Sequence, residues 1–421
     1  MTTLTVPTTA RERMQLAKDA SRSVALLSDE DKAAALHAIA DALDAAVDEI
    51  VAANAEDLER GRATGMAPGL QDRLRLDAAR IGALAEAVRQ VAALPDPVGR
   101  VLDERVIGGG VRLQKVSVPF GVVGSIYEAR PNVTVDIAAL ALRAGNAVVL
   151  RGGTAAEHSN AALVRTMRGA LASRGIDPEA VQTLDDFGRE GARELMQARG
   201  LVDVLVPRGS AQLIETVVTE SSVPVIETGA GVVHIVLDST APTDWARDIV
   251  VNAKAQRPSV CNAVETVLVL ADAAERLIPP VVTALQQAGV TVHGDDTTRS
   301  LAPDVVPVTE DEYALEHMSL DLSMRVVPDL DEALAHIRRY STQHTESIIT
   351  ADEARAERFL TEVDAAVVMA NASTRFTDGG EFGFGAEVGI STQKLHARGP
   401  MGLPELTSVK WLARGGGQVR S

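Results

Sequence analysis

The sequence contains a single cysteine, Cys261, in the segment AQRPSVCNAVET between an expected helix and an expected strand. One cysteine cannot form an internal disulfide or a cysteine metal cluster, so Cys261 is either a buried filler residue or a nucleophile. Loops between regular elements often hold functional residues, and Arg257, four residues earlier, would favour the thiolate. The local sequence therefore permits a reactive thiol without distinguishing it from a buried one.

Two glycine-containing turns each follow an expected strand and precede an expected helix. The first is LRGGT at 150–154, and the second is VPRGS, which contains Arg208, Gly209 and Ser210. Glycine lets the backbone approach a ligand closely, and the N-terminus of a helix attracts an anion. Neither turn has the GxGxxG or P-loop pattern, and each could equally be an ordinary turn between a strand and a helix. Together they indicate a groove for a dinucleotide.

A carboxylate, Glu227, ends the segment VPVIE (223–227), which we expect to be a short buried strand. Ligands of parallel sheets bind at the carboxyl ends of the strands. Taken alone, a glutamate in this position is explained equally well by a capping role and by a catalytic role.

Acidic residues outnumber basic residues by 58 to 41, which gives a formal net charge of −17. This balance argues against nucleic acid as a partner, but it allows a local group of arginines that binds an anion. No apolar run approaches the ~18 residues of a membrane span and no signal-peptide core is present, so we expect a cytoplasmic protein without a membrane partner. The eight histidines have no metal-binding spacing, so we expect no metal.

The elements that must position these residues follow from the hydrophobic periodicity. The first hundred residues have the apolar spacing of amphipathic helices. Beyond residue 116 short apolar runs alternate with helical patterns, which is typical of parallel sheets covered by helices. The expected strands are 117–127, 146–153, 181–186, 202–207 and 223–227, and, in a second block, 232–238, 265–270, 321–328, 346–350 and 364–370.

We therefore expect an α/β protein with two Rossmann-like domains. The expected parts are a dinucleotide-binding domain over 1–104 and 119–232, a cysteine-bearing catalytic domain over 233–390, and an arm and tail over 105–118 and 391–421. RVIGGGVRLQKVSV in the arm alternates like a β-hairpin, and TSVKWLARGGGQVRS in the tail alternates as well. Because isolated hairpins expose unpaired edges, we expect these two segments to join a homo-oligomer.

The combination of motifs resembles the aldehyde dehydrogenase superfamily. Glu227 precedes Cys261 by 34 residues, the separation between the glutamate and the nucleophilic cysteine of that family. Several long segments resemble the branch that acts on γ-glutamyl phosphate: PFGVVGSIYEARPNVT, LRGGT, QRPSVCNAVET, QHTESI and GFGAEVGISTQKLHARGPMGL. The resemblance extends over nearly the whole chain.

The resemblance implies a reaction and roles for particular residues. NADPH would reduce γ-glutamyl 5-phosphate to glutamate 5-semialdehyde with release of phosphate, in the second step of proline synthesis from glutamate. Cys261 would form a thioester, and Asn132 and the Cys261 N–H would stabilise the oxyanion; the family asparagine could instead align near Arg130, and Asn132 could be a turn residue. Glu227 would assist deprotonation of the thiol or order its loop.

The resemblance also implies binding sites for the cofactor and the substrate. The nucleotide would lie on Arg151, Gly152, Gly153, Thr154, Arg208, Gly209 and Ser210, with Glu316 on the nicotinamide ribose. Thr154 replaces the carboxylate that repels a 2′-phosphate in NAD-preferring relatives, which favours NADPH. Arg130, Arg257, His344 and Arg398 are candidates for the anionic substrate, although each could serve in a structural ion pair and His344 could cap a helix–strand junction. A glutamate kinase is the partner that would supply the substrate.

Three other interpretations remain open. A hydrolytic aldehyde dehydrogenase would oxidise an aldehyde with water, but EARPN in place of the usual Trp-Asn motif argues against it. A cysteine acyltransferase would have no use for the two glycine turns. An inactive scaffold would not need Cys261 and Glu227 at the family separation.

Overall fold

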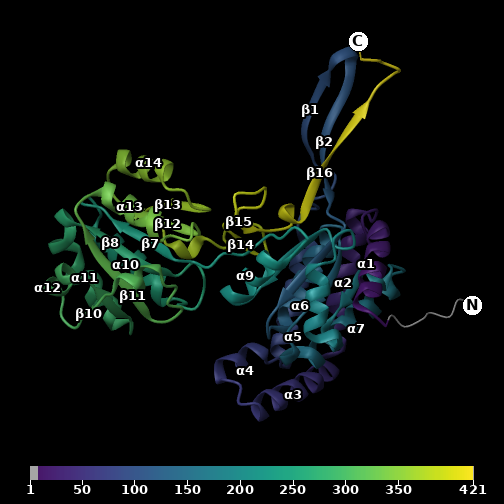
Figure 1. Cartoon of the computed structure of the whole chain (residues 1–421), viewed down its shortest axis with the longest axis horizontal. Coiled ribbons are helices and arrows are strands. Elements are labelled where there is room, and N and C mark those ends of the chain that lie inside the picture. The colour runs from purple at the N-terminus through teal and green to yellow at the C-terminus, as the bar shows by residue number, and fades with distance from the viewer. Residues whose placement is uncertain (1–7, 421) are drawn as a thin grey trace, which may run out of the picture. The chain divides into compact units, whose positions relative to one another are not determined.

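The computed structural model describes residues 8–420 (Figure 1), which form two compact units. Among them, unit 1 comprises the chain up to Thr228, Gly383–Gly389 and the segment from Met401 onward, and unit 2 comprises Gly229–Phe382 and Ile390–Pro400. The division after Thr228 lies four residues before the expected boundary. The expected tail 391–421 is shared between the two units.

Unit 1 contains a parallel sheet of four strands in the order β5-β4-β3-β6. The strands are β3 (Val122–Tyr127), β4 (Ala147–Arg151), β5 (Val181–Thr183) and β6 (Val204–Arg208). Nearly all of their residues are buried, as their continuous apolar sequences require in a sheet covered on both faces. The order places β3 between β4 and β6, so the residues after these three strands meet at one edge.

Two expected strands of this region are wrong in detail. The segment 117–127 is two strands separated at Phe120 and Gly121, where Gly121 has φ +120°. The segment 223–227 forms only one bridge, between Val225 and Leu205. Pro224 lacks the N–H that a regular ladder requires, so pairing does not extend.

Helices pack on the sheet of unit 1 and on one another (Figure 1). They are α1 (Ala10–Val24), α2 (Asp29–Ala45), α3 (Val47–Ala63), α4 (Pro68–Leu74), α5 (Ala78–Ala93), α6 (Pro131–Arg143), α7 (Glu157–Ser173), α8 (Gly188–Met196) and α9 (Ala211–Glu220). Side-chain oxygens of Thr9, Ser28, Asp77 and Ser210 cap the N-termini of α1, α2, α5 and α9. The prediction of helices over the first hundred residues is thus confirmed.

An arm of three antiparallel strands belongs to the same unit. β1 (Val101–Ile107) and β2 (Val111–Pro119) form a hairpin, and β16 (Thr407–Arg414) pairs with β2. In Figure 1 the three strands extend together away from the helices of unit 1. Apolar residues remain exposed on the arm, among them Val106 (71% exposed) and Trp411 (47%).

Unit 2 contains a parallel sheet of seven strands in the order β10-β9-β11-β8-β7-β12-β13. They are β7 (Val233–Leu237), β8 (Val264–Leu270), β9 (Thr291–Gly294), β10 (Val306–Pro307), β11 (Asp321–Val327), β12 (Thr345–Ile349) and β13 (Val367–Ala370). The helices are α10 (Thr243–Ala255), α11 (Ala274–Gln287), α12 (Asp296–Leu301), α13 (Leu330–Tyr340) and α14 (Glu353–Glu362). The expected α/β architecture with two parallel sheets is confirmed.

Alternate residues of β8 show how the sheet of unit 2 is covered. Val267 and Val269 pack into the core that contains α10 and α11, and Leu268 and Leu270 pack into the core of α13 and α14. Because successive side chains of a strand point to opposite faces, β8, the middle strand of the seven, contributes to the cores on both faces of the sheet. The strands β14 (Gly389–Ser391) and β15 (Gly399–Met401) form a separate small sheet. Within the described part of the chain, no helix combines the length and the apolar character of a membrane span.

Candidate active site

Cys261 lies in the turn between α10 and the central strand β8 of unit 2, and its side chain is partly exposed. A hydrogen bond from the Ala263 N–H to the Val260 carbonyl, 3.0 Å long, closes the turn. A thiol that is within reach of solvent and close to a buried strand can meet a ligand while its backbone stays fixed. This placement favours a nucleophile over a buried filler residue.

The residue after the cysteine is anchored on both sides. Buried Asn262 donates from Nδ2 to the carbonyl of Thr377 (2.8 Å), and its own carbonyl accepts from Thr374 Oγ1 (2.7 Å). Both partners come from a segment more than one hundred residues later. These bonds hold the turn in one conformation, which a nucleophile needs if it is to attack along a defined direction.

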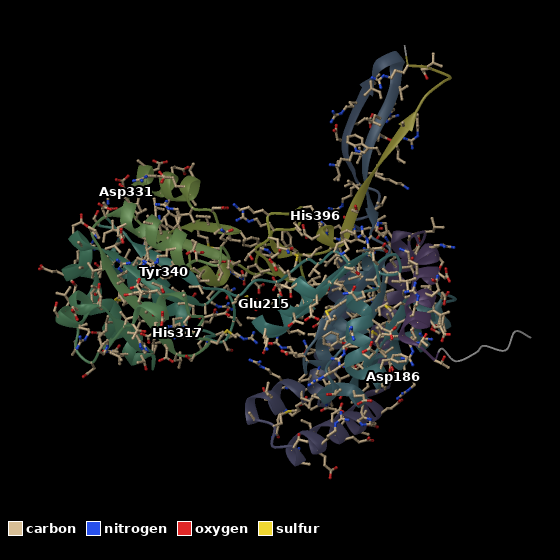
Figure 2. All side chains as sticks on the ribbon, in the orientation of Figure 1. Asp186, Glu215, His317, Asp331, Tyr340 and His396 are labelled. Carbon is tan, nitrogen blue, oxygen red and sulfur yellow. The ribbon has the colours of Figure 1, made fainter. Side chains whose placement is uncertain are left out.

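A glycine packs directly on the backbone of the cysteine. A Cβ on Gly231 would lie 1.6 Å from the Cys261 carbonyl oxygen, so no other residue fits without movement of the backbone. The Gly231 N–H donates to Glu316 Oε1 at 2.9 Å. Glu316 lies between the 3-10 helix η6 (Glu310–Ala314) and β11, in the loop marked by His317 in Figure 2. In this structure Glu316 therefore orders the glycine loop that contacts Cys261.

A fully buried ion pair lies at the base of the same turn. Lys254 Nζ on α10 is 2.7 Å from Glu265 Oε2 on β8. Burial lowers the pKa of Lys254 and raises the pKa of Glu265, and the mutual attraction opposes both shifts. The pair ties together the two elements that flank Cys261. Removing one partner would leave an uncompensated buried charge at the site.

The first glycine turn of unit 1 is organised by a carboxylate that the sequence motifs did not identify. Asp185 accepts from the Gly152 N–H (2.6 Å) and from Asn160 Nδ2 (2.8 Å). Burial raises the pKa of Asp185 to about 6, and these hydrogen bonds oppose the rise. A Cβ on Gly152 would lie 2.2 Å from Asn160 Nδ2, so the turn requires glycine. The result is a fixed backbone turn at the carboxyl end of β4.

The second glycine turn is joined to the end of β3. Glu128 accepts from the Ser210 N–H at Oε2 (2.9 Å) and from Ser210 Oγ at Oε1 (3.2 Å). A Cβ on Gly209 would lie 2.8 Å from Glu128 Oε2. Ser210 also caps α9, the helix marked by Glu215 in Figure 2. Two neighbouring strand ends therefore form one surface, and Glu128, in the segment EARPN, is a second carboxylate for which the sequence analysis predicted no role.

Asn132 lies in the first turn of α6, directly after β3. Its Nδ2 donates to Asp136 Oδ2 at 3.1 Å. Burial raises the pKa of Asp136 to about 6, while this hydrogen bond and the charge of Arg208 lower it. The carboxylate accepts one amide N–H and so orients the side chain of Asn132, and the amide keeps one further N–H.

A cationic cavity opens beside Asn132 within unit 1. It has a volume of about 280 Å³, and its lining includes Arg73, Arg75 and Arg80. Asp72 pairs with Arg75 (3.0 Å) and Arg80 (2.8 Å), and one carboxylate cannot neutralise three guanidinium groups. The sequence pattern predicted only helical scaffold in this region, because a basic cavity between two helices has no local sequence signal.

The four expected substrate-binding cations occupy different environments. Arg130 precedes α6 and is partly buried, and Arg257 is exposed in the turn that contains Cys261. Arg398, 26% exposed, pairs with Asp364 at 2.8 Å. His344 is fully buried between α13 and β12, and burial lowers its pKa to about 4. Burial therefore disfavours the charged form of the ring, and the position of His344 agrees with a histidine at the helix–strand junction, while its part in substrate binding stays a prediction.

The other expected site residues divide between the units. Arg151 ends β4 and donates from Nε to the Gly188 carbonyl (3.3 Å), and Thr154 begins the next 3-10 helix after Gly153. Glu227 lies near the end of the first segment of unit 1, whereas Cys261 belongs to unit 2.

The chain is similar to known proteins over its whole length. The model of the aldehyde dehydrogenase family matches residues 4–312. A protein of Leifsonia xyli subsp. xyli named gamma-glutamyl phosphate reductase is 64% identical over 421 residues, which cover all of both chains. A protein of the same name from Clavibacter michiganensis subsp. michiganensis is 63% identical over 97% of this chain and 94% of its own. The crystal structure of gamma-glutamyl phosphate reductase from Thermotoga maritima is 43% identical, with a TM-score of 0.96 over 98% of this chain and 100% of its own.

Proposed function

The chain belongs to the γ-glutamyl phosphate reductases of the aldehyde dehydrogenase family, and from this premise we propose how it reduces γ-glutamyl 5-phosphate. The products are glutamate 5-semialdehyde and phosphate, in the second step of proline biosynthesis from glutamate. The observation that carries the proposed mechanism is the partly exposed Cys261 thiol in a turn anchored on both sides.

Cys261 acts as the nucleophile of the acyl transfer. Its thiolate sulfur forms a bond to the acyl carbon, the bond from that carbon to the phosphate oxygen breaks, and phosphate leaves with the electron pair. The thioester on Cys261 would accept a hydride from the nicotinamide cofactor, when that cofactor is bound, and become a thiohemiacetal. Collapse of the thiohemiacetal releases the semialdehyde and restores the thiolate.

Stabilisation of the oxyanion is assigned to the Cys261 N–H and the side chain of Asn132. An oxyanion of this kind needs hydrogen-bond donors that are oriented before the reaction. Asp136 supports this role because it accepts one N–H of Asn132 and fixes the direction of the amide.

Glu227 is assigned to deprotonation of the thiol or to ordering of its loop. Activation of water, the role of this carboxylate in hydrolytic relatives, would destroy the thioester before reduction. The alternatives of a hydrolytic aldehyde dehydrogenase and a cysteine acyltransferase are not favoured by the relatives, which share one name.

The nicotinamide cofactor is assigned to the two glycine turns, and we propose a preference for NADPH. The Gly152 turn, held by Asp185, provides the close backbone approach that a pyrophosphate needs. Thr154 is neutral, and its carbonyl accepts from Arg60, whose charge is balanced by ion pairs with Asp57 (2.6 Å) and Glu157 (3.5 Å). A neutral Thr154 close in sequence to the cation of Arg151 suits a 2′-phosphate. A kcat/KM that is tenfold higher with NADH than with NADPH would contradict this preference.

Anion binding by the substrate site is assigned to Arg130, Arg257, His344 and Arg398, together with the cavity arginines beside Asn132. Arginine suits both anionic groups of the substrate because its planar fork bonds carboxylate and phosphate in a bidentate manner. Arg398 must exchange its ion pair with Asp364 for the ligand if it takes part.

We further propose that the chain forms a homo-oligomer through the arm and that a glutamate kinase supplies its substrate. The exposed side chains of Val106 and Trp411 and the open edges of the arm support association with another subunit. Sedimentation of a monomer at micromolar concentration would contradict it. The proposed location is the cytoplasm, where a reducing environment keeps a catalytic thiol free.

The reverse assay tests the reaction most directly. With glutamate 5-semialdehyde and NADP⁺, we expect NADPH formation that requires phosphate, because phosphate must cleave the thioester. Reduction of NADP⁺ at the same rate without phosphate would indicate hydrolysis by water and refute the proposal.

A further inference from the structure

Arg375 is a cation near the nucleophile that none of the motifs above contains. It lies in the 3-10 helix η7 (Thr374–Phe376) of unit 2, and its side chain is partly buried. The segment around it is joined to the region before and after Cys261 by four hydrogen bonds. These are Ser373 Oγ to Asn252 Oδ1 (2.7 Å), Thr374 Oγ1 to the Asn262 carbonyl (2.7 Å), Arg375 Nε to Gln256 Oε1 (2.9 Å) and Asn262 Nδ2 to the Thr377 carbonyl (2.8 Å).

These bonds determine where the guanidinium group lies. Gln256, which accepts from Nε, directly precedes Arg257, and Asn262 directly follows Cys261. A segment bonded at residues 252, 256 and 262 must lie along the turn that contains the thiol. Arg375 is therefore held beside the same turn that exposes Arg257.

The charges in this place are not balanced by a close ion pair. Among the described residues Arg375 has no carboxylate within ion-pair distance, in contrast to Arg398 with Asp364. Burial lowers the pKa of Arg375 most, Arg257 lowers it further, and Asp378 and the Cys261 thiolate raise it. Two guanidinium groups that repel each other beside a thiolate form a site that an anion would stabilise.

We propose that Arg375, together with Arg257, forms an anion site that stabilises the Cys261 thiolate and then binds the phosphate group of the substrate as it leaves. As sulfur bonds to the acyl carbon and the carbon–oxygen bond breaks, negative charge develops on the departing phosphate. Guanidinium donors fixed by Gln256 stabilise that charge. The second part of this inference rests on the proposed function, whereas the first part concerns the thiol alone.

The first experiment measures the reactivity of Cys261 without substrate or cofactor. Alkylation by iodoacetamide is followed against pH in the wild type, in R375Q and R375K, and in the control R247Q, which removes an exposed arginine of α10 that pairs with Asp248. We expect alkylation of R375Q at pH 7 to be slower by about tenfold, because loss of a nearby cation disfavours the thiolate. R375K and R247Q should react like the wild type.

The second experiment uses inorganic phosphate as the probe of the anion site. Phosphate should slow alkylation of the wild type and R247Q but have little effect on R375Q, and it should protect R375K less because lysine offers no bidentate contact. The proposal requires R375Q to show both slower alkylation and weaker protection by phosphate. If R375Q has the pH profile of the wild type, or is protected by phosphate as the wild type is, the proposal is overturned.

Folding and the proposed reaction are checked separately. Thermal unfolding tests whether R375Q is folded, and we expect the midpoint of the wild type. If R375Q does not fold, R375K with its weakened protection by phosphate provides the decisive comparison. Because alkylation requires no turnover, failure of the reductase reaction would leave the test of the anion site intact. In the reverse reaction we expect R375Q to raise KM for phosphate by about tenfold while KM for NADP⁺ stays unchanged.

Discussion

Replacement of Gly231 by alanine tests whether the contact between the glycine loop and the nucleophile determines catalysis. The added Cβ would lie 1.6 Å from the Cys261 carbonyl oxygen and 3.1 Å from the Cys261 Cα. Real Cβ atoms essentially never come within 3.0 Å of such a neighbour, so one backbone must move by about 1.4 Å. The opposing atom belongs to the backbone, so a change of rotamer cannot relieve the clash.

The expected loss follows from that displacement. A shift of about 1 Å in a reacting group can reduce the rate about 100-fold, so we expect kcat of G231A to fall by at least that factor. The strain should lower the free energy of unfolding by about 1–3 kcal/mol. Steady-state kinetics and chemical denaturation measure the two effects, and iodoacetamide labelling reports the changed exposure of Cys261.

Gly169→Ala provides the matched control. Gly169 lies within α7, and a Cβ there would meet no atom within 4 Å. We expect G169A to keep the wild-type kcat and to gain about 0.5–1 kcal/mol of stability, because alanine is the better helix former. A G231A variant with kcat and labelling rate within threefold of the wild type would refute the reasoning, since the close approach would then have no consequence.

Three further predictions concern the chemistry and its pH dependence. Cys261→Ser should abolish turnover and leave folding and NADPH binding intact, which activity assays and a thermal shift with NADPH would check; residual wild-type activity would exclude the thioester. Glu227→Gln should lower kcat by about 10- to 100-fold if the carboxylate deprotonates the thiol; full turnover would eliminate the base role. The pKa of Asp136 in the folded protein is about 6, above the ordinary value of 3.8. Above pH 6 the buried carboxylate is ionised and lowers the free energy of unfolding, and this loss declines as the pH falls from 6 towards 4. The difference between the two pKa values corresponds to about 3 kcal/mol at most, and the partial exposure of Asp136 reduces this figure. We therefore expect the free energy of unfolding of Asp136→Asn to exceed that of the wild type by about 1–2 kcal/mol at pH 8 and to differ little from it at pH 4. Equal stability of the two proteins at pH 8 would contradict the burial cost.

The arm shows the limit of local sequence signals in the fold. Alternation of apolar and polar residues indicated strands in both 105–118 and 407–421, because side chains of a strand alternate between two faces. Which strand pairs with which is a separate question. The register of β16 on β2, with Trp411 opposite Lys115, joins segments almost 300 residues apart, and local patterns contain no information about it.

The candidate site divides in the same way. The type of residue and the 34-residue separation from Glu227 are properties of the sequence, and they are sufficient to single out Cys261. The burial of His344 is not a property of the sequence, because it depends on the packing of α13 and β12 around the ring. The sequence analysis predicted no role for Asp185, Glu128 or Arg375, because their contacts are with backbone and side-chain atoms distant in sequence.

By itself, then, the sequence determined the alternation of strands and helices and the α/β class, since these depend on residue type and on the spacing of residues along the chain. Its resemblance to the family also predicted Cys261 as the nucleophile. The tertiary structure decided which polar groups are buried and which backbones touch, since burial and close approach arise when segments far apart in the chain pack together. The contact of Gly231 with Cys261 is an example: only in the folded chain does a glycine thirty residues away become the neighbour that leaves room for the backbone of Cys261.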